Sequence, residues 1–157
     1  MIKVITTWQP WASLWACEAK MFETRGWETA YRGPIAIHAG LKWVGFYPQI
    51  FSQAAHEALS LALPGFKCMH ALPRGAIIAT GDLVNCYPII APARIEGMVS
   101  TGKILTPDGP VSIYGNEYLF GDWTPGRFAW EVTNRKLLDT PIPVQGKQGL
   151  WNWDGAL

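Results

Sequence analysis

Hydrophobic residues recur at helical spacing in two stretches of the chain. The longer stretch has an apolar stripe that consists of Tyr47, Ile50, Phe51, Ala54, Ala55, Ala58 and Leu59. We expect this helix to begin at Pro48 and to end at Pro64-Gly65, where the sequence no longer supports a helix. A shorter stretch over residues 10–19 repeats apolar side chains at the same spacing: Trp11, Leu14 and Trp15. The pattern therefore predicts two main helices.

Strands are predicted where β-branched residues cluster or where apolar and polar residues alternate. These stretches are residues 3–7, 22–27, 35–39, 76–84, 127–133 and 150–153. The Gly81-Asp82 pair indicates a bend or bulge in one of them. Residues 88–110 carry four prolines and three glycines, so we expect an inserted excursion there, either a hairpin or a lid. Five or more strands and two main helices predict a single α+β domain over residues 1–157, built as a mixed β-barrel.

The composition fits one globular domain and narrows the functional classes. Of the 157 residues, 49% are hydrophobic and 16% are charged, which is not the composition of a disordered chain. The net charge of +1 excludes a broadly basic nucleic-acid coat, although it leaves room for a local basic cleft. The sequence has neither the apolar run of a signal peptide nor a stretch that could span a bilayer, so we expect a cytoplasmic protein that does not enter a membrane.

Neither a metal nor a cofactor is expected. The odd number of cysteines lacks tight spacing, which indicates thiols rather than a disulfide framework: Cys17, Cys68 and Cys86. The three histidines share no common spacing either: His38, His56 and His70. The chemistry must therefore come from other side chains.

The strongest chemical signal is the group Lys20, Glu23 and Arg25, which lies in a stretch otherwise rich in apolar and aromatic residues. If the chain is extended from Phe22 on, Glu23 and Arg25 project from the same face, because side chains alternate along a strand. Charges on an inward face are costly unless they are paired or used, so we expect these residues to line a cleft. Two alternatives stay open: Lys20 as a solvated lysine at a helix end, and Glu23 with Arg25 as an internal ion pair.

Nine tryptophans are many for a domain of this size, and part of their surface is expected to line a groove. Four of them are candidates for stacking on an unpaired base: Trp11, Trp27, Trp123 and Trp130. For each one alone, core packing is the alternative, and Trp130, in the middle of a predicted strand, is the one we expect in the core.

Several motifs stand in a characteristic order near both ends of the chain. They are Gln9-Pro10-Trp11-Ala12, the Lys-x-x-Glu-x-Arg of Lys20, Glu23 and Arg25, Trp27, Tyr31-Arg32-Gly33, Ile37-His38-Ala39, Phe128-Ala129-Trp130, Pro141-Ile142-Pro143 and Gln148-Gly149-Leu150-Trp151. In these motifs, and over most of its length, the chain resembles the ASCH family of the PUA-like superfamily. The resemblance implies a PUA-like β-barrel with a cleft at the Lys-x-x-Glu-x-Arg segment. It also implies RNA or nucleotide binding, the commonest role in that superfamily.

The same resemblance implies a second function. Some bacterial relatives are amidohydrolases that act on acetylated cytidine with catalytic Lys, Thr and Glu residues, and others are reported as ribonucleases. Lys20 matches the catalytic lysine by its place in the motif. The place of the threonine is taken by Glu23, Thr24 follows one residue later, and no motif locates the glutamate. A small hydrolase that uses Lys20 and Glu23 in the same cleft is therefore the alternative function.

We expect the chain to bind RNA, or a single-stranded or modified nucleotide, in a charged cleft lined by tryptophan. The predicted ligand-binding residues are Gln9, Trp11, Lys20, Glu23, Thr24, Arg25, Trp27, Arg32, His38 and Trp123. Arg32 would reach a phosphate and His38 would hydrogen-bond in the cleft, with a surface role and a buried structural role as their alternatives. Further candidates for the rim are Lys42, Lys147 and Gln148. A third interpretation is a protein-interaction module that uses the 88–110 excursion, with no partner identified.

Overall fold

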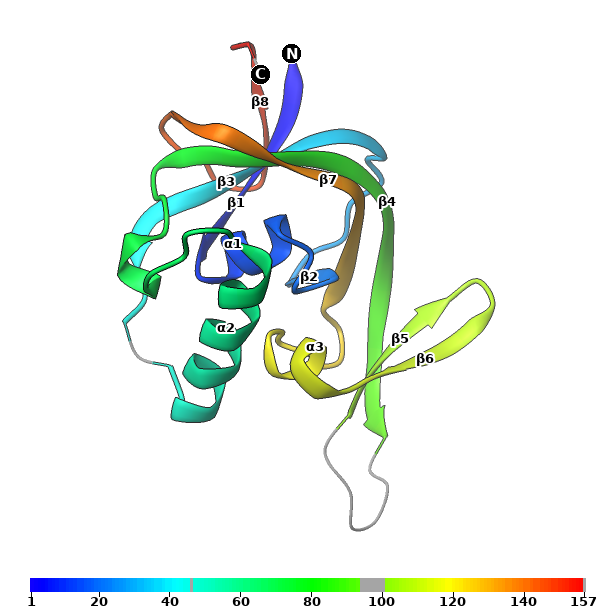
Figure 1. Cartoon of the computed structure of the whole chain (residues 1–157). Coiled ribbons are helices and arrows are strands. Elements are labelled where there is room, and N and C mark those ends of the chain that lie inside the picture. The colour runs from blue at the N-terminus through cyan, green and yellow to red at the C-terminus, as the bar shows by residue number, and fades with distance from the viewer. Residues whose placement is uncertain (46, 94–100, 157) are drawn as a thin grey trace.

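The chain folds around one curved sheet, described in a computed structural model for residues 1–45, 47–93 and 101–156 (Figure 1). The strands are β1 (Ile2–Gln9), β2 (Phe22–Arg25), β3 (Gly33–Trp43), β4 (Ala76–Ala93), β5 (Thr101–Thr106), β6 (Gly109–Ile113), β7 (Phe128–Pro143) and β8 (Leu150–Trp153). Their order is β2-β7-β4-β3-β1-β8, with β5 paired to β4 and β6 paired to β5. The mixed α+β class predicted from the sequence is confirmed.

Strand β4 is the longest strand and links the two parts of the sheet. Its first part pairs antiparallel with β3 and β7, and its last part leaves them to pair with β5 (Figure 1). Its register against β7 shifts between Thr80 and Asp82. At Gly81 an added Cβ would lie 2.6 Å from Val132 Cγ1, so only glycine allows β7 to approach this closely. The bulge predicted at Gly81-Asp82 is therefore confirmed.

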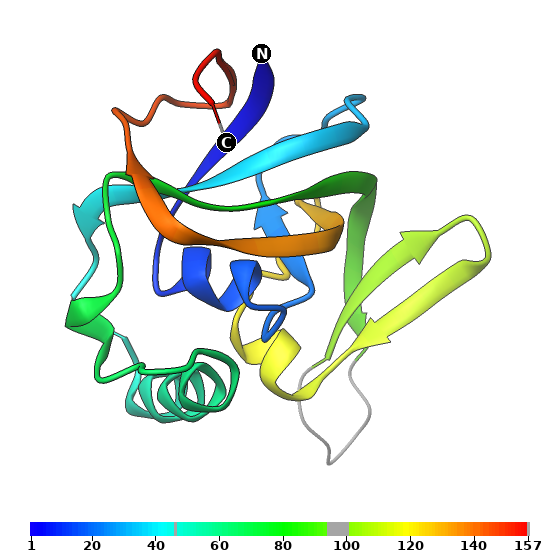
Figure 2. The ribbon, with the colours of Figure 1, turned by 45° about the horizontal axis from the view of Figure 1, so that its top comes forward.

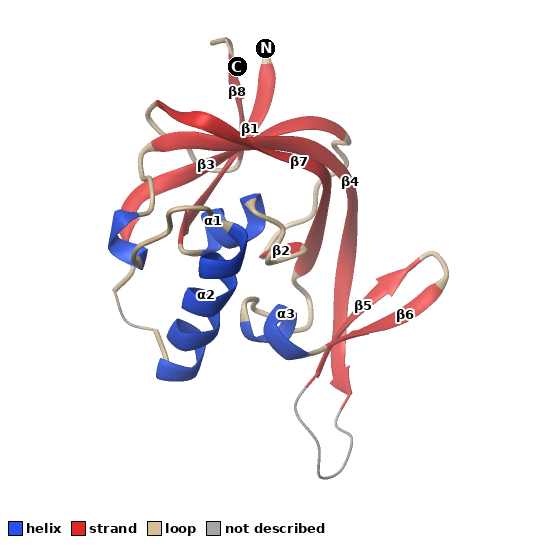
Figure 3. Cartoon of the chain, viewed as in Figure 1, coloured by secondary structure: helices blue, strands red, loops and turns tan. Residues whose placement is uncertain are grey.

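Three helices lie on one side of the sheet: α1 (Trp11–Ala16), α2 (Gln49–Ala62) and α3 (Gly115–Leu119) (Figure 3). A short 3-10 turn, η1 (Met69–Ala71), precedes β4. Figure 2 shows α1 between the sheet and α2. Trp15 of α1 is fully buried in the main core beneath the sheet, while Leu14 packs with Phe51 and Leu59 of α2. One short helix thus joins two hydrophobic clusters.

The sheet is not closed into a barrel. The path of paired strands ends at β2 and β8, and within the described ranges no ladder joins these two strands. The helices lie on one face of the sheet (Figure 2). The predicted closure into a mixed β-barrel is therefore not seen in the strand pairing.

Three details of the predicted helices are wrong. Helix α1 ends at Ala16 rather than Ala19, because the chain turns at Glu18 with a positive φ of 65°. Helix α3 was not predicted, since five residues are too few to show a hydrophobic period. Ile50 was placed on the apolar stripe of α2 but is 69% exposed, whereas the buried residues of that helix are Phe51, Ala55 and Leu59.

The excursion predicted over residues 88–110 is in large part a continuation of the sheet. Strand β4 runs on past Pro88 to Ala93, and β5 and β6 form a hairpin beside it. Pro88 stands where the ladder to β7 ends, a position at which a missing backbone N–H is tolerated. Residues 94–100, in the middle of the predicted excursion, lie outside the described residues. Within the described ranges, none of the helices is long and apolar enough to cross a membrane.

The difference in burial predicts different effects for two leucines of α2. Leu59 is fully buried and Leu61 is 90% exposed. Leu59→Ala should lower the free energy of unfolding by about 2–5 kcal/mol, because it leaves a cavity between α1 and α2. Leu61→Ala, the matched control, should change it by less than about 0.5 kcal/mol. Urea titration followed by tryptophan fluorescence measures both, and equal losses would contradict the packing of α2 described here.

Candidate functional site

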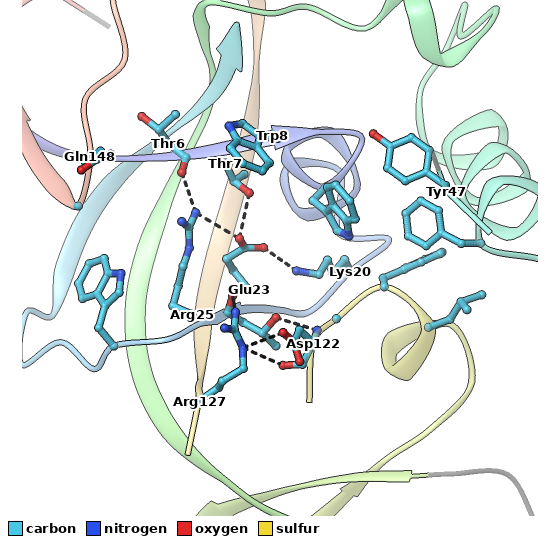
Figure 4. Close-up of a pocket in the computed structure, with 18 of the residues that line it drawn as sticks. Thr6, Thr7, Trp8, Lys20, Glu23, Arg25, Tyr47, Asp122, Arg127 and Gln148 are labelled. Atoms are coloured by element: carbon cyan, nitrogen blue, oxygen red, sulfur yellow. Dashed lines mark hydrogen bonds and ion pairs between the residues drawn. The ribbon is translucent and has the colours of Figure 1, made fainter. Parts of the chain in front are cut away.

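A cavity of about 870 Å³ lies beside β2, on the side of the sheet that carries the helices (Figure 4). Side chains from five separate segments line it, within residues 6–11, 20–27, 47–51, 119–127 and 147–149. These segments belong to β1, α1, β2, the start of α2, the chain between α3 and β7, and the loop before β8. The site therefore exists only when the whole chain is folded.

At the centre of the cavity, the Glu23 carboxylate contacts two cations and a hydroxyl group (Figure 4). Lys20 Nζ lies 2.5 Å from Oε2, and Arg25 Nη2 lies 3.2 Å from Oε1. The Thr7 hydroxyl donates a hydrogen bond to Oε1 at 2.9 Å. Arg25 Nη2 also donates to the carbonyl oxygen of Thr6 at 2.7 Å. The structure thus brings the three residues of the Lys-x-x-Glu-x-Arg segment into one ion cluster.

The ion cluster is largely withdrawn from solvent. The side chain of Lys20 is 1% exposed, that of Glu23 is 8% exposed and that of Arg25 is 21% exposed. Burial alone would raise the pKa of Glu23, but the charges of Lys20 and Arg25, with the hydrogen bonds from Lys20 and Thr7, outweigh it and hold that pKa below its ordinary value. Glu23 is therefore ionised at neutral pH. The alternative of a solvated Lys20 at a helix end is wrong.

The main chain at Lys20 is fixed by two side chains from distant parts of the sequence. Arg135, on β7, donates from Nη1 to the carbonyl oxygen of Lys20 at 2.8 Å, and its own side chain is only 1% exposed. The carboxylate of Glu117, on α3, accepts hydrogen bonds from the backbone N–H groups of Met21 and Phe22 at 2.7 and 2.9 Å. The turn after α1 consequently delivers the Lys20 ammonium to the cavity in one defined position.

A second charged pair borders the cavity below the ion cluster (Figure 4). Arg127 Nε lies 3.3 Å from Asp122 Oδ2, and its Nη2 donates to the carbonyl oxygen of Thr24 at 3.1 Å. The hydroxyl of Thr24 accepts a hydrogen bond from the backbone N–H of Asp122 at 3.0 Å. A hydrogen bond from Thr124, together with the charge of Arg127, lowers the pKa of Asp122. This pair ties the chain before β7 to β2.

Two groups of aromatic side chains line the cavity. In one group the rings of Trp11, Tyr47 and Phe51 pack together with centroids 5.1–5.4 Å apart. In the other, Trp27 is 37% exposed and packs edge-on against the buried Trp130, with centroids 4.6 Å apart. A further tryptophan, Trp8, is 45% exposed and lies above the ion cluster in Figure 4. The cavity therefore offers both charged and aromatic surface.

The lining carries a local excess of positive charge. Its ionisable side chains are four cations and two carboxylates: Lys20, Arg25, Arg127, Lys147, Glu23 and Asp122. The excess of two positive charges is larger than the net charge of +1 of the whole chain. A positive field in a concave, partly desolvated site attracts anionic groups.

Six of the ten predicted ligand-binding residues line this cavity, and four lie elsewhere. The six are Trp11, Lys20, Glu23, Thr24, Arg25 and Trp27. Trp123 is buried in the cluster under β5, where its Nε1 donates to the carbonyl oxygens of Glu117 and Tyr118. Arg32 is exposed on a turn and donates to neighbouring carbonyl oxygens. Of the suggested rim residues, Lys147 and Gln148 line the cavity.

Gln9 and His38 have structural roles instead. The side-chain amide of Gln9 hydrogen-bonds to the backbone N–H and hydroxyl of Ser13 and to the carbonyl oxygen of Pro73, so it fixes the start of α1. His38 is fully buried, and its Nε2 lies 3.0 Å from the carbonyl oxygen of Val144. Burial lowers the pKa of His38 despite that hydrogen bond, which suits a neutral core histidine.

Several lining residues were not in the predicted set: Thr6, Thr7, Trp8, Tyr47, Asp122 and Arg127. Tyr47 was assigned only to the apolar stripe of the second helix. Thr7 precedes the Gln9-Pro10-Trp11-Ala12 motif. The alternation of side chains along β1 assigns Thr7 to one face of the strand, but it does not identify the residues that this face contacts. Arg127 reaches Thr24 only because Arg25 pairs with Phe128 in the ladder between β2 and β7. No local pattern in the sequence reports that pairing.

The described residues contain no group of three or more His, Cys, Asp and Glu side chains that is placed to hold a metal ion. A scan against models of protein families gave no match to this chain, and a search of curated proteins gave none either.

The buried carboxylate predicts a specific loss of stability when it is removed. Glu23→Gln should lower the free energy of unfolding at pH 7 by about 3–5 kcal/mol, because Lys20 and Arg25 would lose their anionic partner. Glu28→Gln, at an exposed position on the same segment, is the matched control and should change it by less than about 0.5 kcal/mol. Urea titration measures both variants.

The same variant should change the pH dependence of stability. Folding lowers the pKa of Glu23. The contribution of its carboxylate to the free energy of unfolding is therefore complete above the ordinary pKa of 4.5 and is lost as the pH falls through the lowered pKa. Unfolding free energies measured between pH 3 and 5 should therefore fall less steeply in Glu23→Gln than in the wild type. Parallel curves for the two proteins would show that Glu23 is not held ionised by its neighbours.

Proposed function

We propose that the chain is an ASCH-like domain with a PUA-like architecture whose barrel stays open between β2 and β8, and that its cavity binds one unpaired nucleotide of RNA or of another single strand, or a modified nucleotide. The observation that carries this proposal is the buried ion cluster of Lys20, Glu23 and Arg25 inside an aromatic-lined cavity. The ordered motifs of the sequence support the family, and the curved sheet that wraps the helices supports the architecture.

The ion cluster has donors and acceptors left for a base edge. The Lys20 ammonium carries three N–H donors, and Glu23 is the hydrogen-bond acceptor found for it within the described ranges. Glu23 offers about four lone-pair sites, of which Lys20, Thr7 and Arg25 occupy three. A base with a ring-nitrogen acceptor beside an exocyclic amine, as N3 and N4 of cytosine, would accept from Lys20 and donate to Glu23.

The aromatic groups suit the faces of the base. Trp27 is supported edge-on by Trp130, and Trp11 by Tyr47, so each ring is held in place before a ligand enters. Stacking of an unpaired base on such a ring contributes about 1–3 kcal/mol. The remaining cations of the lining, Arg127 and Lys147, would face the phosphate.

The charge of the chain favours a short single-stranded ligand over a duplex. With a net charge of +1, the molecule lacks the extended basic surface that tight, sequence-independent duplex binding requires. The positive charge is instead concentrated where the cavity lies. This distribution of charge favours a ligand that places one nucleotide in the cavity.

Binding to single-stranded RNA should depend on the cavity residues. Trp27→Ala should weaken binding by about 5- to 150-fold, the effect of removing one stacking ring, and Arg25→Ala should weaken it as well. Arg32→Ala is the matched control, since Arg32 is an exposed arginine outside the cavity, and its affinity should equal that of the wild type. Filter binding with single- and double-stranded RNA and DNA measures these affinities. Equal affinities in the wild type and the three variants would show that RNA does not bind in the cavity.

A hydrolase is the second candidate function, and one contact favours it. The Thr7 hydroxyl donates to Glu23, which also binds Lys20, so a hydroxyl, a carboxylate and an ammonium group adjoin in one cavity. Such a set would allow the Thr7 oxygen to attack an amide carbonyl as Glu23 accepts its proton, after which the C–N bond breaks, the amine leaves with that proton and water hydrolyses the Thr7 ester. However, the lowered pKa of Glu23 makes its carboxylate a weak proton acceptor at neutral pH. Binding therefore ranks above hydrolysis.

Incubation with acetylated cytidine and with labelled RNA separates the two functions. If the cavity only binds, no product should form at high protein concentration, with or without divalent metal. Thr7→Val removes the hydroxyl with little change in shape and provides the control. Turnover by the wild type that is lost in Thr7→Val would establish the hydrolase and displace the binding proposal.

A further inference from the structure

Three tryptophan rings near the cavity each carry a cation on one face. Lys42 Nζ lies 4.9 Å from the ring centroid of Trp8, the guanidinium carbon of Arg74 lies 5.6 Å from that of Trp43, and Lys147 Nζ lies 5.7 Å from that of Trp151. We name these three pairs the Trp–cation rim. They are all the pairs of this kind found in the part of the chain that the structure describes.

The Trp–cation rim adjoins the cavity at each of its three pairs. Trp8 and Lys147 line the cavity themselves. Trp151 donates from Nε1 to the hydroxyl of Thr6, another lining residue, at 3.1 Å. Trp43 packs edge-on against the lining residue Tyr47, with ring centroids 6.3 Å apart. In Figure 4 Gln148, Thr6, Trp8 and Tyr47 follow one another along the same side of the ion cluster.

The cations of the rim differ from those of the cavity floor. Lys20, Arg25 and Arg127 each form an ion pair with a carboxylate. Lys42, Arg74 and Lys147 form none within residues 1–45, 47–93 and 101–156, and all three are exposed. Their charges are therefore not neutralised inside the molecule and remain available to an anionic partner.

The backbone beside the rim is adapted to an exposed tryptophan. Gly40, on β3, faces Trp8, and a Cβ at this position would lie 2.8 Å from Trp8 Cδ1 and 3.4 Å from Thr6 Cγ2. The absent side chain lets the Trp8 ring lie against the sheet while 45% of the residue stays exposed. Side chains two apart on a strand lie about 7 Å from each other. Thr6, which hydrogen-bonds to Trp151, and Trp8 therefore place two of the three pairs next to each other on β1.

We infer that the Trp–cation rim binds the sugar–phosphate backbone and flanking bases of a single strand that continues on both sides of the nucleotide in the cavity. This inference rests on the proposed function and adds to it that the ligand is an oligonucleotide rather than a free nucleotide. The exposed ring of Trp8 and the three exposed cations, which form no ion pair within the described ranges, match the two repeating features of single strands, bases that stack and phosphates that carry charge. A binding surface for duplex would instead require a continuous basic face, which the near-neutral chain does not have.

The double variant Lys42→Ala/Arg74→Ala tests the rim without altering the lining of the cavity, to which neither residue belongs. The matched control is Arg32→Ala/Lys136→Ala, which removes one exposed arginine and one exposed lysine that belong neither to the rim nor to the cavity lining and makes the same change in net charge. Fluorescence anisotropy with a labelled nine-nucleotide RNA, at several salt concentrations, measures oligonucleotide binding. Calorimetry with the four ribonucleoside monophosphates measures binding of a single nucleotide.

The rim variant should bind the nine-nucleotide RNA about 5- to 30-fold more weakly than the wild type, while the control variant should bind as the wild type does. For the rim variant, the slope of log affinity against log salt concentration should be smaller in magnitude by about 1.4 than for the wild type. This difference is the contribution of two phosphate contacts to a single strand. Affinity for the monophosphates should be the same in all three proteins.

Three other outcomes would overturn the inference, and they differ in what they leave standing. If the wild type binds a monophosphate as tightly as the nine-nucleotide RNA, or if the rim and control variants lose equal affinity, the cavity binds a nucleotide and the rim has no part in it. If the wild type binds neither probe, the inference and the proposed function both fall.

Discussion

The ionised carboxylate of Glu23 is the group on which the rest of this site depends. Lys20 and Arg25 are held within 3.2 Å of it, and without it two cations would be left in a largely desolvated space with no anionic partner. Its own burial is compensated by the same two cations and by the Thr7 hydroxyl. The cluster leaves one positive charge in excess, so it is stable as a group and still attractive to an anion.

Such a cluster constrains the fold around it. Salt bridges of this kind contribute only if their geometry is well defined. Here the geometry is set by Arg135 and Glu117, which hold the main chain at Lys20 and at the two residues that follow it. The cation on β7 and the carboxylate on α3 are far from Lys20 in sequence. The curved sheet and the position of α1 beneath it bring them together, which ties the site to the complete domain rather than to its motif alone.

The parts of this molecule that were predicted from the sequence are those with a local cause. The α2 helix follows from its periodicity, the bulge in β4 from Gly81, and the grouping of Glu23 with Arg25 from alternation along β2. The misplaced residues depend on long-range pairing. The sequence near His38 does not indicate that its ring contacts the carbonyl oxygen of Val144. The sequence near Trp123 does not indicate that its ring packs in a core under β5. Thr7 and Arg127 enter the cavity only through tertiary contacts with β2.

Floor and rim of the cavity use positive charge in two different ways. The floor cations are at most 30% exposed and are paired, which gives them fixed positions but neutralises much of their charge, so they suit recognition of a base edge. The rim cations lie exposed over tryptophan rings, where their charge stays available and is screened by salt. A chain with a net charge of +1 can therefore present a positive site to a single strand without a basic surface, because the carboxylates that balance its charge lie mostly outside this region.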